Sequence, residues 1–381
     1  MRVIEDDPDL ELSVVATGMH LAPEFGLTYR TIEEDGFRID RKVEMLQSSG
    51  GDTDVAKSVG VGLIAFTDAL ATLRPDIVVL LGDRFELLSP AVAAFVARIP
   101  IAHIHGGETS QGAIDEGVRH AVTKLASLHF AATEAYRRRI IQMGEDPARV
   151  FAFGAPGLDA LRDLTLLSQA ELDSRLGFSL AKPIAIVTYH PVTLEPGSAA
   201  RQIDSLLAAL LREDVRAVFT KANADEEGRL INEHIAAFCA ERPDDYRLFD
   251  NLGQMVYLSC LQHVDVMVGN SSSGLIEAPS FELPTVNIGD RQLGRIRATN
   301  VIDVGSTAAE IAAGIGQALS PEWRVGLKNM VNPYSGRGEE SVSAHIKEQL
   351  KHAALGEALL KKRFYDLEPD ADSHALREGI R

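Results

Sequence analysis

Several features that would assign a function directly are missing from this sequence of 381 residues. It contains only two cysteines, Cys239 and Cys260, which excludes a disulfide scaffold and a metal site built from cysteines. It has no G-x-G-x-x-G fingerprint, no G-x-x-x-x-G-K-[ST] loop and no G-x-S-x-G nucleophile elbow. The motifs that most readily reveal a dinucleotide, P-loop or serine-hydrolase site are therefore absent.

Long apolar runs and positive charge are also scarce. The longest apolar runs, Ile77–Leu81 and Ala91–Ala97, are far shorter than the roughly 18 residues that a membrane-spanning helix needs. The start, Met1 to Asp9, is acidic, so we expect no signal peptide, and the low cysteine content suits a reducing, cytoplasmic compartment. With 38 basic and 55 acidic residues the formal charge is −17, which argues against nucleic acid as a partner.

The sequence instead alternates short β-branched runs with helical patterns, which predicts an α/β fold with doubly wound parallel sheets. The predicted strands are Leu12–Ala16, Ile77–Leu81, Ile101–His105, Ile184–Thr188, Val215–Thr220, Val264–Val268 and Thr285–Ile288. The predicted helices between them include Asp54–Leu73, Glu116–Ser127, Ser198–Leu211 and Asp225–Ala240. The two sets of elements predict two Rossmann-like domains that face each other across a cleft.

The alternation of predicted strands and helices also indicates the domain boundaries. We expect an N-terminal domain over residues 1–165 and a second domain over residues 166–338, joined by a charged helical segment, Leu161–Lys182. A long helix is predicted from Glu339 to about Phe364, and with the loose acidic tail it makes up residues 339–381.

The first predicted strand is unusual, because no glycine-rich loop follows Leu12–Ala16. In a doubly wound fold the loop after the first strand often cradles phosphate. Either the sheet is built differently, or the chain starts late and lacks one strand–loop unit. The plain alternative is that Leu12–Ala16 is itself the first strand.

Ligands of α/β sheets bind at the carboxyl ends of the strands, and chemically useful residues follow several strands in the first half. Asp83 follows one strand, and Gly106-Gly107-Glu108 follows the next. Asp115 and Arg119 come shortly after, on one face of a helix, where a simple ion pair is the plain alternative. Asp83 could likewise only cap a helix. Together these groups suit acid/base chemistry on a weakly acidic C–H bond.

The second half places a different chemistry at its strand ends. His190 ends one strand, and the segment Gly269–Gly274 offers serine hydroxyls and N–H groups at a helix start, which suits an anion. Arg291 follows another strand, with Arg295 and Arg297 close behind. Serine hydroxyls and guanidinium groups at adjacent strand ends predict a diphosphate site. The alternatives are a serine cap and a solvated basic face. His103 and His105 alternate on a strand, so we expect no metal site there.

Six segments occur in an order and at a spacing that make the chain resemble a known family. They are Leu81–Glu86, His103–Glu108, Asp115–Lys124, Tyr189–Pro191, Gly269–Gly274 and Asn287–Gln292. The chain resembles the hydrolysing UDP-N-acetylglucosamine 2-epimerases of sialic-acid-type sugar biosynthesis. The resemblance runs from about Leu10 to Val304, and Phe364-Tyr365-Asp366 resembles the family's tail.

This resemblance implies a glycosyltransferase-B-like fold and conversion of UDP-GlcNAc and water to N-acetylmannosamine and UDP. A base removes the C2 proton, UDP leaves from C1 to give a glycal, and water adds at C1 while a proton returns to the other face of C2. The resemblance implies neither metal nor nicotinamide, a UDP-sugar as the partner, and a homo-oligomer, either a dimer or a tetramer.

The resemblance also assigns roles by position. Asp83 and Asp115 become acid/base carboxylates, with Arg119 orienting Asp115; His190 becomes an acid/base group or phosphate contact, and His20 lies on the substrate side. The residues matching the nucleotide-binding set are Arg84, Asn270, Ser271, Ser272, Glu277 and Arg291.

Two departures from the family pattern stand out. Some relatives carry a catalytic Glu immediately before the Gly-Gly pair, whereas this chain has His105 there, so either His105 or Glu108 is the candidate C2 base. The opening strand and its T-G-[TS]-R-A-[ED]-Y-G loop are also missing. We therefore expect this polypeptide to be poorly stable and weakly active, and an extended chain to be active.

Other readings of the sequence remain open. The same chemistry could act on a UDP-linked 2,4-diacetamido-trideoxyhexose. A non-hydrolysing epimerase would keep UDP attached, a retaining glycosyltransferase would need an acceptor, and an inactive sensor would bind the UDP-sugar without releasing UDP.

Overall fold

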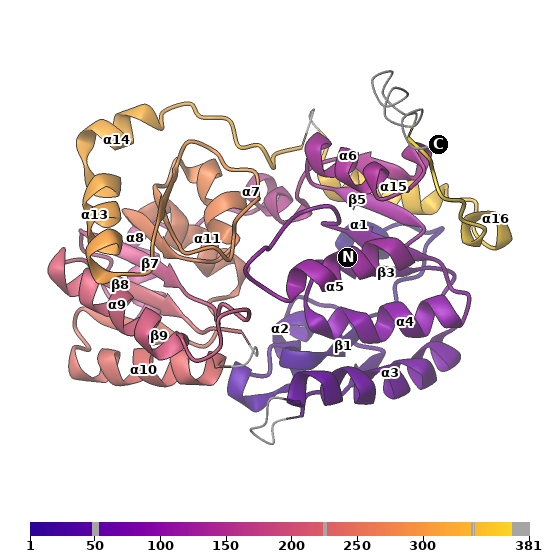
Figure 1. Ribbon diagram of the computed structural model, residues 1–381, viewed down its shortest axis with the longest axis horizontal. Helices are drawn as coiled ribbons and strands as arrows, with labels where there is room; N and C mark the ends of the chain where they lie inside the picture. Colours follow the sequence, from indigo (N-terminus) through magenta and orange to yellow (C-terminus); the bar gives the residue numbers. More distant parts are fainter. Residues whose placement is uncertain (48–52, 224–226, 337, 339, 368–381) are drawn as a thin grey trace, which may run out of the picture.

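The computed structural model describes residues 1–47, 53–223, 227–336, 338 and 340–367. The chain folds into an N-terminal half and a C-terminal half that lie side by side, each built on parallel strands flanked by helices (Figure 1). The α/β architecture predicted from the alternating pattern is confirmed.

The N-terminal half contains two separate parallel sheets among the described residues. Four strands pair in the order β3-β4-β5-β6, and a further pair, β1-β2, forms a small sheet of its own. The strand bounds are β1 Val15–Thr17, β2 Arg41–Val43, β3 Val78–Leu81, β4 Ile101–Ile104, β5 Leu128–Ala131 and β6 Val150–Ala152. The helices are α1 Arg2–Glu5, α2 Tyr29–Glu34, α3 Asp54–Leu73, α4 Leu88–Val96, α5 Asp115–Leu125 and α6 Glu134–Gln142.

The C-terminal half is built on one parallel sheet of six strands in the order β12-β11-β10-β7-β8-β9. The strand bounds are β7 Ile184–Thr188, β8 Arg216–Thr220, β9 Tyr246–Phe249, β10 Val266–Gly269, β11 Thr285–Ile288 and β12 Val301–Val304. The helices around it are α8 Gln169–Leu176, α9 Ala199–Arg212, α10 Gly228–Glu241, α11 Gly253–His263, α12 Ser273–Ile276, α13 Ala308–Leu319 and α14 Pro321–Gly326. All residues of β7, β10 and β11 are buried, because helices cover both faces of this sheet.

Several predicted elements have different bounds or a different form in the structure. The segment Leu161–Lys182 is helical over only about half of its length, in the end of α7 Ala160–Asp163 and in α8 Gln169–Leu176. The predicted long helix from Glu339 to Phe364 is wrong: α15 covers Val342–Lys351, and a separate turn, α16, covers Glu357–Leu360. Gly356, with a φ of +84°, lies directly before α16 in a conformation that does not continue a helix. Glu339, Asp225 and the acidic tail beyond Leu367 lie outside the described residues.

The end of the described chain returns to the N-terminal half. Val342, Ile346 and Leu350 of α15 join Leu359 in a core cluster that covers β4 and β5. Near the other end of the chain, Asp7 receives hydrogen bonds from Lys347 and Lys351, at 2.8–3.0 Å. The two ends of the described chain are therefore joined on one face of the four-stranded sheet.

Strand β3 is less well covered than its neighbours. Val79 and Leu81 are 41% and 58% exposed, although they lie on a strand of the N-terminal sheet. β3 pairs with β4 on one side, and the described residues place β1 and β2 in a different sheet. Strand β1, near the first predicted strand, leads directly into a 3₁₀ turn at Gly18–Leu21.

One described helix differs from the expectation based on uninterrupted apolar runs. Helix α3 is long and apolar enough, by length and composition alone, to cross a membrane. Its residues Phe66, Ala69 and Leu70 are buried in the core of the N-terminal half, which is also typical of a core helix.

Candidate active site

A cluster of charged residues joins the two halves at the carboxyl ends of their strands. Asp83, which follows β3, accepts hydrogen bonds from Arg119 on α5 and, at 3.3 Å, from Arg295 of the C-terminal half. Ser110 lies between them, with its Oγ 2.8 Å from Arg119 Nη2 and 3.2 Å from Arg295 Nη2. Arg119 was expected to orient Asp115; it is bound to Asp83 and Glu116.

Asp115 lies at the start of α5 between two arginines from different halves. Its carboxylate is 3.9 Å from Arg84 Nη1 and 3.9 Å from Arg291 Nη2, and its side chain is almost fully buried. Two guanidinium groups beside a buried carboxylate favour its ionised form. Asp115, from the half with the acid/base candidates, thus meets Arg291, from the half with the nucleotide-binding candidates.

His105 and Glu108 form a close pair just after β4. The Nδ1 atom of His105 lies 2.6 Å from Glu108 Oε1, and the other carboxylate oxygen is 3.3 Å from Arg295 Nη1. Burial acts to raise the pKa of Glu108, but Arg295 and His105 outweigh it and lower that pKa below its usual value. An ionised Glu108 accepts the Nδ1 proton, which leaves Nε2 of a neutral His105 as an acceptor. His105 has a φ of +65°, a conformation that the loop before Gly106-Gly107 imposes.

His190 is fixed at the end of β7 by backbone contacts. Its Nδ1 accepts a hydrogen bond from the Asn223 N–H at 3.2 Å, so Nε2 carries the proton when the ring is neutral. Asn270 accepts from the His190 N–H at 2.7 Å and donates to the His190 carbonyl at 2.8 Å. Burial lowers the pKa of His190 well below its usual value, and Arg291 and Arg84 lower it further. His190 is therefore a neutral hydrogen-bond donor.

The serine-rich segment after β10 forms a tight turn. Ser271 Oγ accepts a hydrogen bond from the Ser273 N–H at 3.3 Å, and α12 that follows is a single turn of four residues. Such a short helix contributes little macrodipole, so hydroxyl and N–H groups of Ser271 and Ser272 would have to hold an anion. Glu277, at the end of this turn, is half-buried, and loss of contact with water raises its pKa.

His20 lies on the turn after β1 and contacts Thr28. Its Nδ1 is 2.8 Å from Thr28 Oγ1, and burial lowers its pKa. Its neighbour Gly18 lies against Glu86, which places the turn near the Asp83 loop. The structure thus places His20 beside Thr28, on the 3₁₀ turn that follows β1.

The loops after β4 and β11 interlock at the boundary between the halves. A Cβ on Gly112 would lie 3.0 Å from the Arg291 Cα, and one on Gly294 would lie 2.7 Å from Thr109 Oγ1. Arg295 also donates to the Thr109 carbonyl at 2.7 Å. The sequence pointed to the arginines after β11 as a group, but it could not show that Arg295 crosses into the other half.

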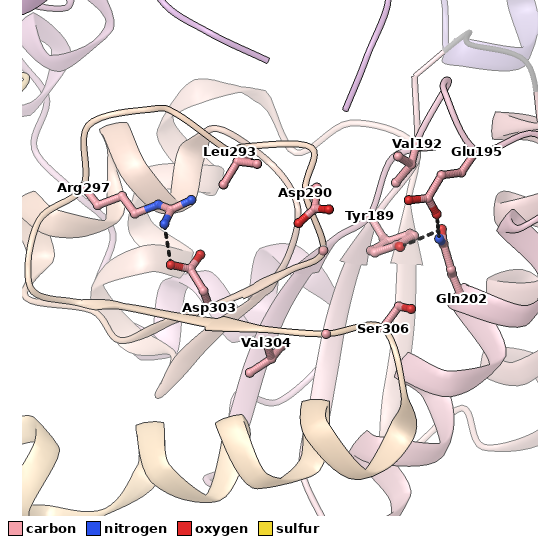
Figure 2. A pocket seen from close by; sticks show the side chains of 12 residues that line it. Tyr189, Val192, Glu195, Gln202, Asp290, Leu293, Arg297, Asp303, Val304 and Ser306 are labelled. Atoms are coloured by element: carbon pink, nitrogen blue, oxygen red, sulfur yellow. Dashed lines mark hydrogen bonds and ion pairs between the residues drawn. The ribbon is translucent and has the colours of Figure 1, made fainter. Parts of the chain in front are cut away.

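A cavity of about 470 Å³ lies at the ends of β7, β11 and β12 in the C-terminal half (Figure 2). Tyr189 and Asp290 line it, and they directly precede His190 and Arg291 in the chain. Figure 2 shows Gln202 bonded to Tyr189 and Glu195 on one side and the Arg297–Asp303 ion pair on the other. Of the residues singled out from the sequence, Arg297 lines this cavity, but the acid/base candidates do not, so we place the candidate site at the charged cluster instead, where residues of both halves converge. Among the described residues, no group of three His, Cys, Asp or Glu side chains gathers as a metal site would require.

Comparison with known proteins assigns the chain to a family. The sequence profile of the family described as UDP-N-acetylglucosamine 2-epimerase matches residues 2–351. The chain belongs to this family. It is 43% identical over 301 residues to the GDP/UDP-N,N'-diacetylbacillosamine 2-epimerase (hydrolyzing) of Campylobacter jejuni, covering 79% of this chain and 78% of the relative. It is 40% identical over 320 residues to the UDP-N,N'-diacetylbacillosamine 2-epimerase (hydrolyzing) of Legionella pneumophila, covering 84% of both.

More distant family members cover nearly the whole chain. The UDP-N-acetylglucosamine 2-epimerase of Neisseria meningitidis is 28% identical over 96% of this chain and 94% of its own length. The crystal structure of a UDP-GlcNAc 2-epimerase from Neisseria meningitidis bound to UDP-GlcNAc matches with a TM-score of 0.75 at 18% identity, over 92% of this chain and 94% of that one. The family membership and the predicted two-part, glycosyltransferase-B-like fold are thereby confirmed.

Proposed function

We propose that this protein is a hydrolysing 2-epimerase of a UDP-linked 2-acetamido sugar. The reaction consumes a UDP-sugar and water and yields UDP and the free sugar with inverted configuration at C2. One observation carries the proposal: Asp115, from the half with the acid/base candidates, lies 3.9 Å from Arg291, from the half with the diphosphate candidates. A sugar C2 and a diphosphate on C1 are separated by a similarly short span, so one substrate can contact both groups.

Elimination of UDP requires that negative charge on the leaving diphosphate be stabilised. Arg291 and the hydroxyl groups of Ser271 and Ser272 are assigned to the diphosphate, and the neutral His190 donates its Nε2–H there. Glu277, next along the chain, is assigned to the ribose hydroxyls. Charge-assisted bonds from Arg291 would strengthen as the C1–O bond breaks, which lowers the barrier to elimination.

Inversion at C2 requires two proton-transfer groups, one on each face of the sugar. We assign His105 Nε2 and Asp115 to these two positions. Glu108 acts through His105 as a positioning residue, because its carboxylate holds the Nδ1 proton at 2.6 Å. One group takes the C2 proton as UDP leaves and a C1=C2 double bond forms; water then adds across this bond, its OH to C1 and its proton, relayed through the other group, to C2.

Asp83 is assigned a structural role in this mechanism, unlike Asp115 and His105. Its carboxylate is held by Arg119 and Arg295, and Arg295 also contacts Glu108. We therefore assign Asp83 to fixing Arg295 across the boundary of the two halves, rather than to the proton transfer itself.

The relatives favour one substrate class over another. The Campylobacter and Legionella proteins, at 43% and 40% identity, are named for N,N'-diacetylbacillosamine, a 2,4-diacetamido sugar. We therefore propose UDP-N,N'-diacetylbacillosamine as the preferred substrate. UDP-GlcNAc is the second candidate, supported by the Neisseria relative that aligns over 96% of this chain at 28% identity.

The test is to incubate the purified chain with each nucleotide sugar in heavy water and to follow the products by NMR. We expect free UDP, a free 2-epimeric sugar and one deuterium at C2, with a higher kcat/KM for the diacetamido substrate. An epimeric product that keeps its UDP would indicate a non-hydrolysing epimerase. Release of UDP only with an acceptor, without deuterium at C2, would indicate a glycosyltransferase. Binding without turnover would indicate a sensor.

The His105–Glu108 pair has its own test. His105→Gln is expected to lower kcat by about 10²–10⁴-fold, the usual contribution of a positioned proton-transfer group. Glu108→Gln should lower kcat less, because the neutral amide can still accept the Nδ1 proton of His105 but holds it more weakly than a carboxylate does. His234→Gln, at a surface histidine paired with Asp204, is the matched control and should leave kcat unchanged. Unchanged turnover in His105→Gln would remove His105 from the mechanism.

A further inference from the structure

Two buried tyrosines meet at the boundary between the halves. Tyr136 lies on α6 of the N-terminal half, and Tyr334 lies on the segment that follows α14. Figure 1 shows this segment crossing from the C-terminal half toward α6. Both side chains are fully buried, and their hydroxyl oxygens are 2.8 Å apart. Neither residue belongs to the six segments that carry the family resemblance.

The two hydroxyl groups hold one residue of the loop after β11. The Ile296 N–H donates to the Tyr136 hydroxyl at 2.8 Å, and the Tyr334 hydroxyl donates to the Ile296 carbonyl at 3.0 Å. Since the Tyr334 proton is used in this bond, the Tyr136 hydroxyl donates to the Tyr334 oxygen. Each hydroxyl then donates once and accepts once. Both polar backbone groups of Ile296 are satisfied in this way, although the residue lies outside any helix or strand.

Ile296 directly follows Arg295, which reaches across to the candidate site. Arg295 Nη1 lies 3.3 Å from Glu108 Oε2, and Arg295 Nη2 lies 3.3 Å from Asp83 Oδ2. An arginine side chain has many rotamers, so its guanidinium group stays in one place only if its backbone is also held. The bonds to Ile296 hold this backbone on both sides of the peptide unit.

Helix α6 also supports the loop after β4, which carries His105 and Glu108. A Cβ on Gly107 would overlap the carbonyl oxygen of Tyr136, so this close approach requires a glycine. Arg139, one turn further along α6, donates to the Gly107 carbonyl at 2.5 Å. One helix therefore fixes the loop after β4 through its backbone and the loop after β11 through the Tyr136 hydroxyl.

We propose that Tyr136 and Tyr334 are positioning residues, which set the contact of Arg295 with Glu108 and, through Glu108, the orientation of His105. The effect on catalysis rests on the proposed function, whereas the effect on the Glu108–His105 pair does not. Without one hydroxyl, a backbone group of Ile296 loses its partner inside the protein, which is costly, and the loop shifts to find another.

The tyrosines act as neutral hydrogen-bonding groups in this assignment. Burial raises the pKa of both hydroxyl groups above the usual value, so neither ionises near neutral pH. A role confined to stability makes a different prediction. Loss of either hydroxyl would then lower the unfolding free energy but would leave Glu108 and His105 in place.

The first experiment measures UDP release by variants that keep the aromatic ring. Tyr136→Phe and Tyr334→Phe are each expected to lower kcat about 10- to 100-fold, as a small displacement of a proton-transfer group does. Tyr246→Phe, at a buried tyrosine that packs against Phe219 and Phe238, is the matched control and should keep the parent kcat. An unchanged kcat in either of the first two variants overturns the proposal.

Binding of UDP should separate from turnover in these variants. The dissociation constant of UDP is expected to change less than about threefold, because Gln292 anchors the turn at Arg291 to the Asn270 carbonyl, at 2.8 Å. Calorimetric titration with UDP measures this constant. Loss of UDP affinity in proportion to kcat would mean a general disturbance of the loop and would overturn the positioning role.

The second experiment asks whether Tyr136 acts through Arg295. In a chain that already carries Arg295→Gln, adding Tyr136→Phe should change kcat less than about twofold, because the group that the hydroxyl positions is gone. Two effects that multiply would overturn the proposal.

The third experiment does not need turnover. NMR of the protein with ¹⁵N-labelled histidine, at about pH 8 where imidazoles are mostly neutral, reports which ring nitrogen carries the proton. The His105 signal, assigned by its loss in His105→Gln, should show the Nδ1–H form in the parent and a mixture with the Nε2–H form in Tyr136→Phe. His234 is the internal control. A parent that shows this change but releases no UDP would refute the proposed function and keep the positioning role. An unchanged His105 signal in Tyr136→Phe overturns the positioning role, whether or not the parent is active.

Discussion

The sheets of the two halves consist of similar parallel strands but are covered to different extents. All five residues of β7 in the C-terminal sheet are buried, whereas Val79 and Leu81 of β3 in the N-terminal sheet are largely exposed. The half assigned to UDP therefore has a complete apolar core. The half assigned to proton transfer depends more on charge: Asp83 and Glu108 are held in place by Arg295 from across the boundary. The chemistry is thus expected to lie on the more weakly packed half, and the binding on the firmly packed one.

Removing the charge of Asp115 tests this division most strongly. Asp115→Asn is expected to lower turnover by several orders of magnitude and to leave UDP affinity nearly intact, because a proton-transfer group acts in the transition state. Steady-state kinetics and calorimetric titration with UDP measure the two effects. Loss of UDP binding with normal turnover would reverse the roles of the two halves.

The difference in packing has a direct stability test. Ile186→Ala, in the buried β7, is expected to cost about 2–5 kcal/mol of unfolding free energy through lost apolar contact and the cavity left behind. Leu81→Ala, in the exposed part of β3, should cost less than about 1 kcal/mol, because little surface is removed from water at that position. Urea unfolding of both variants measures the contrast. Equal costs would mean that β3 is covered in solution.

His103 supplies a pH-dependent contribution in the N-terminal half. It is buried, with Nε2 2.8 Å from the Gly82 carbonyl, and burial lowers its pKa to about 4. Between pH 6.5 and about 4 the unfolded chain binds more protons than the folded one, so stability falls as the pH is lowered through this range, by up to about 3 kcal/mol. His103→Gln should flatten this part of the stability profile, whereas the surface variant His352→Gln should follow the parent.

The effect of Arg291 on binding is expected to be of similar or smaller size. Arg291→Ala should weaken UDP binding by about 1.5–3 kcal/mol, the loss of a charge-assisted bond. Arg297→Ala is the control. Arg297 lies further along the same loop, where it is paired with Asp303, and its loss should change UDP affinity little. Titration with UDP decides between them; a larger loss in the control would move the nucleotide site toward the cavity of Figure 2.

Sequence patterns predicted the fold where one signal dominated. The fully buried strands Ile184–Thr188 and Thr285–Ile288, and the uninterrupted helix Asp54–Leu73, have the predicted bounds. The strands that were missed have three or four residues, and two of them, Leu128–Ala131 and Tyr246–Phe249, carry His, Tyr or Arg among their apolar positions. Runs that short give no clear period, so pairing with neighbouring strands decides their conformation.

The sequence predicted individual residues of the candidate site from the strands they follow, but not how residues from different strands are paired. Asp83, Asp115 and His190 could be found because each follows a recognisable strand. The partners of these residues could not be predicted: Arg119 lies 36 residues from Asp83 in the chain and Arg295 lies 212 residues away, and both meet it through tertiary packing. The role of Arg119 in orienting Asp115 stays a prediction, because helical spacing alone does not show that Arg119 also binds Asp83 and Glu116.

Arg295 also determines how separable the two halves are. It is anchored in the loop after β11, yet its guanidinium group is bonded to Thr109, Asp83 and Glu108 of the other half. A chimera that combines one half of this protein with the opposite half of a relative would therefore assemble correctly only if the relative supplies a matching arginine or matching acceptors. Exchange of halves between family members is constrained by this single side chain more than by the linker that connects them.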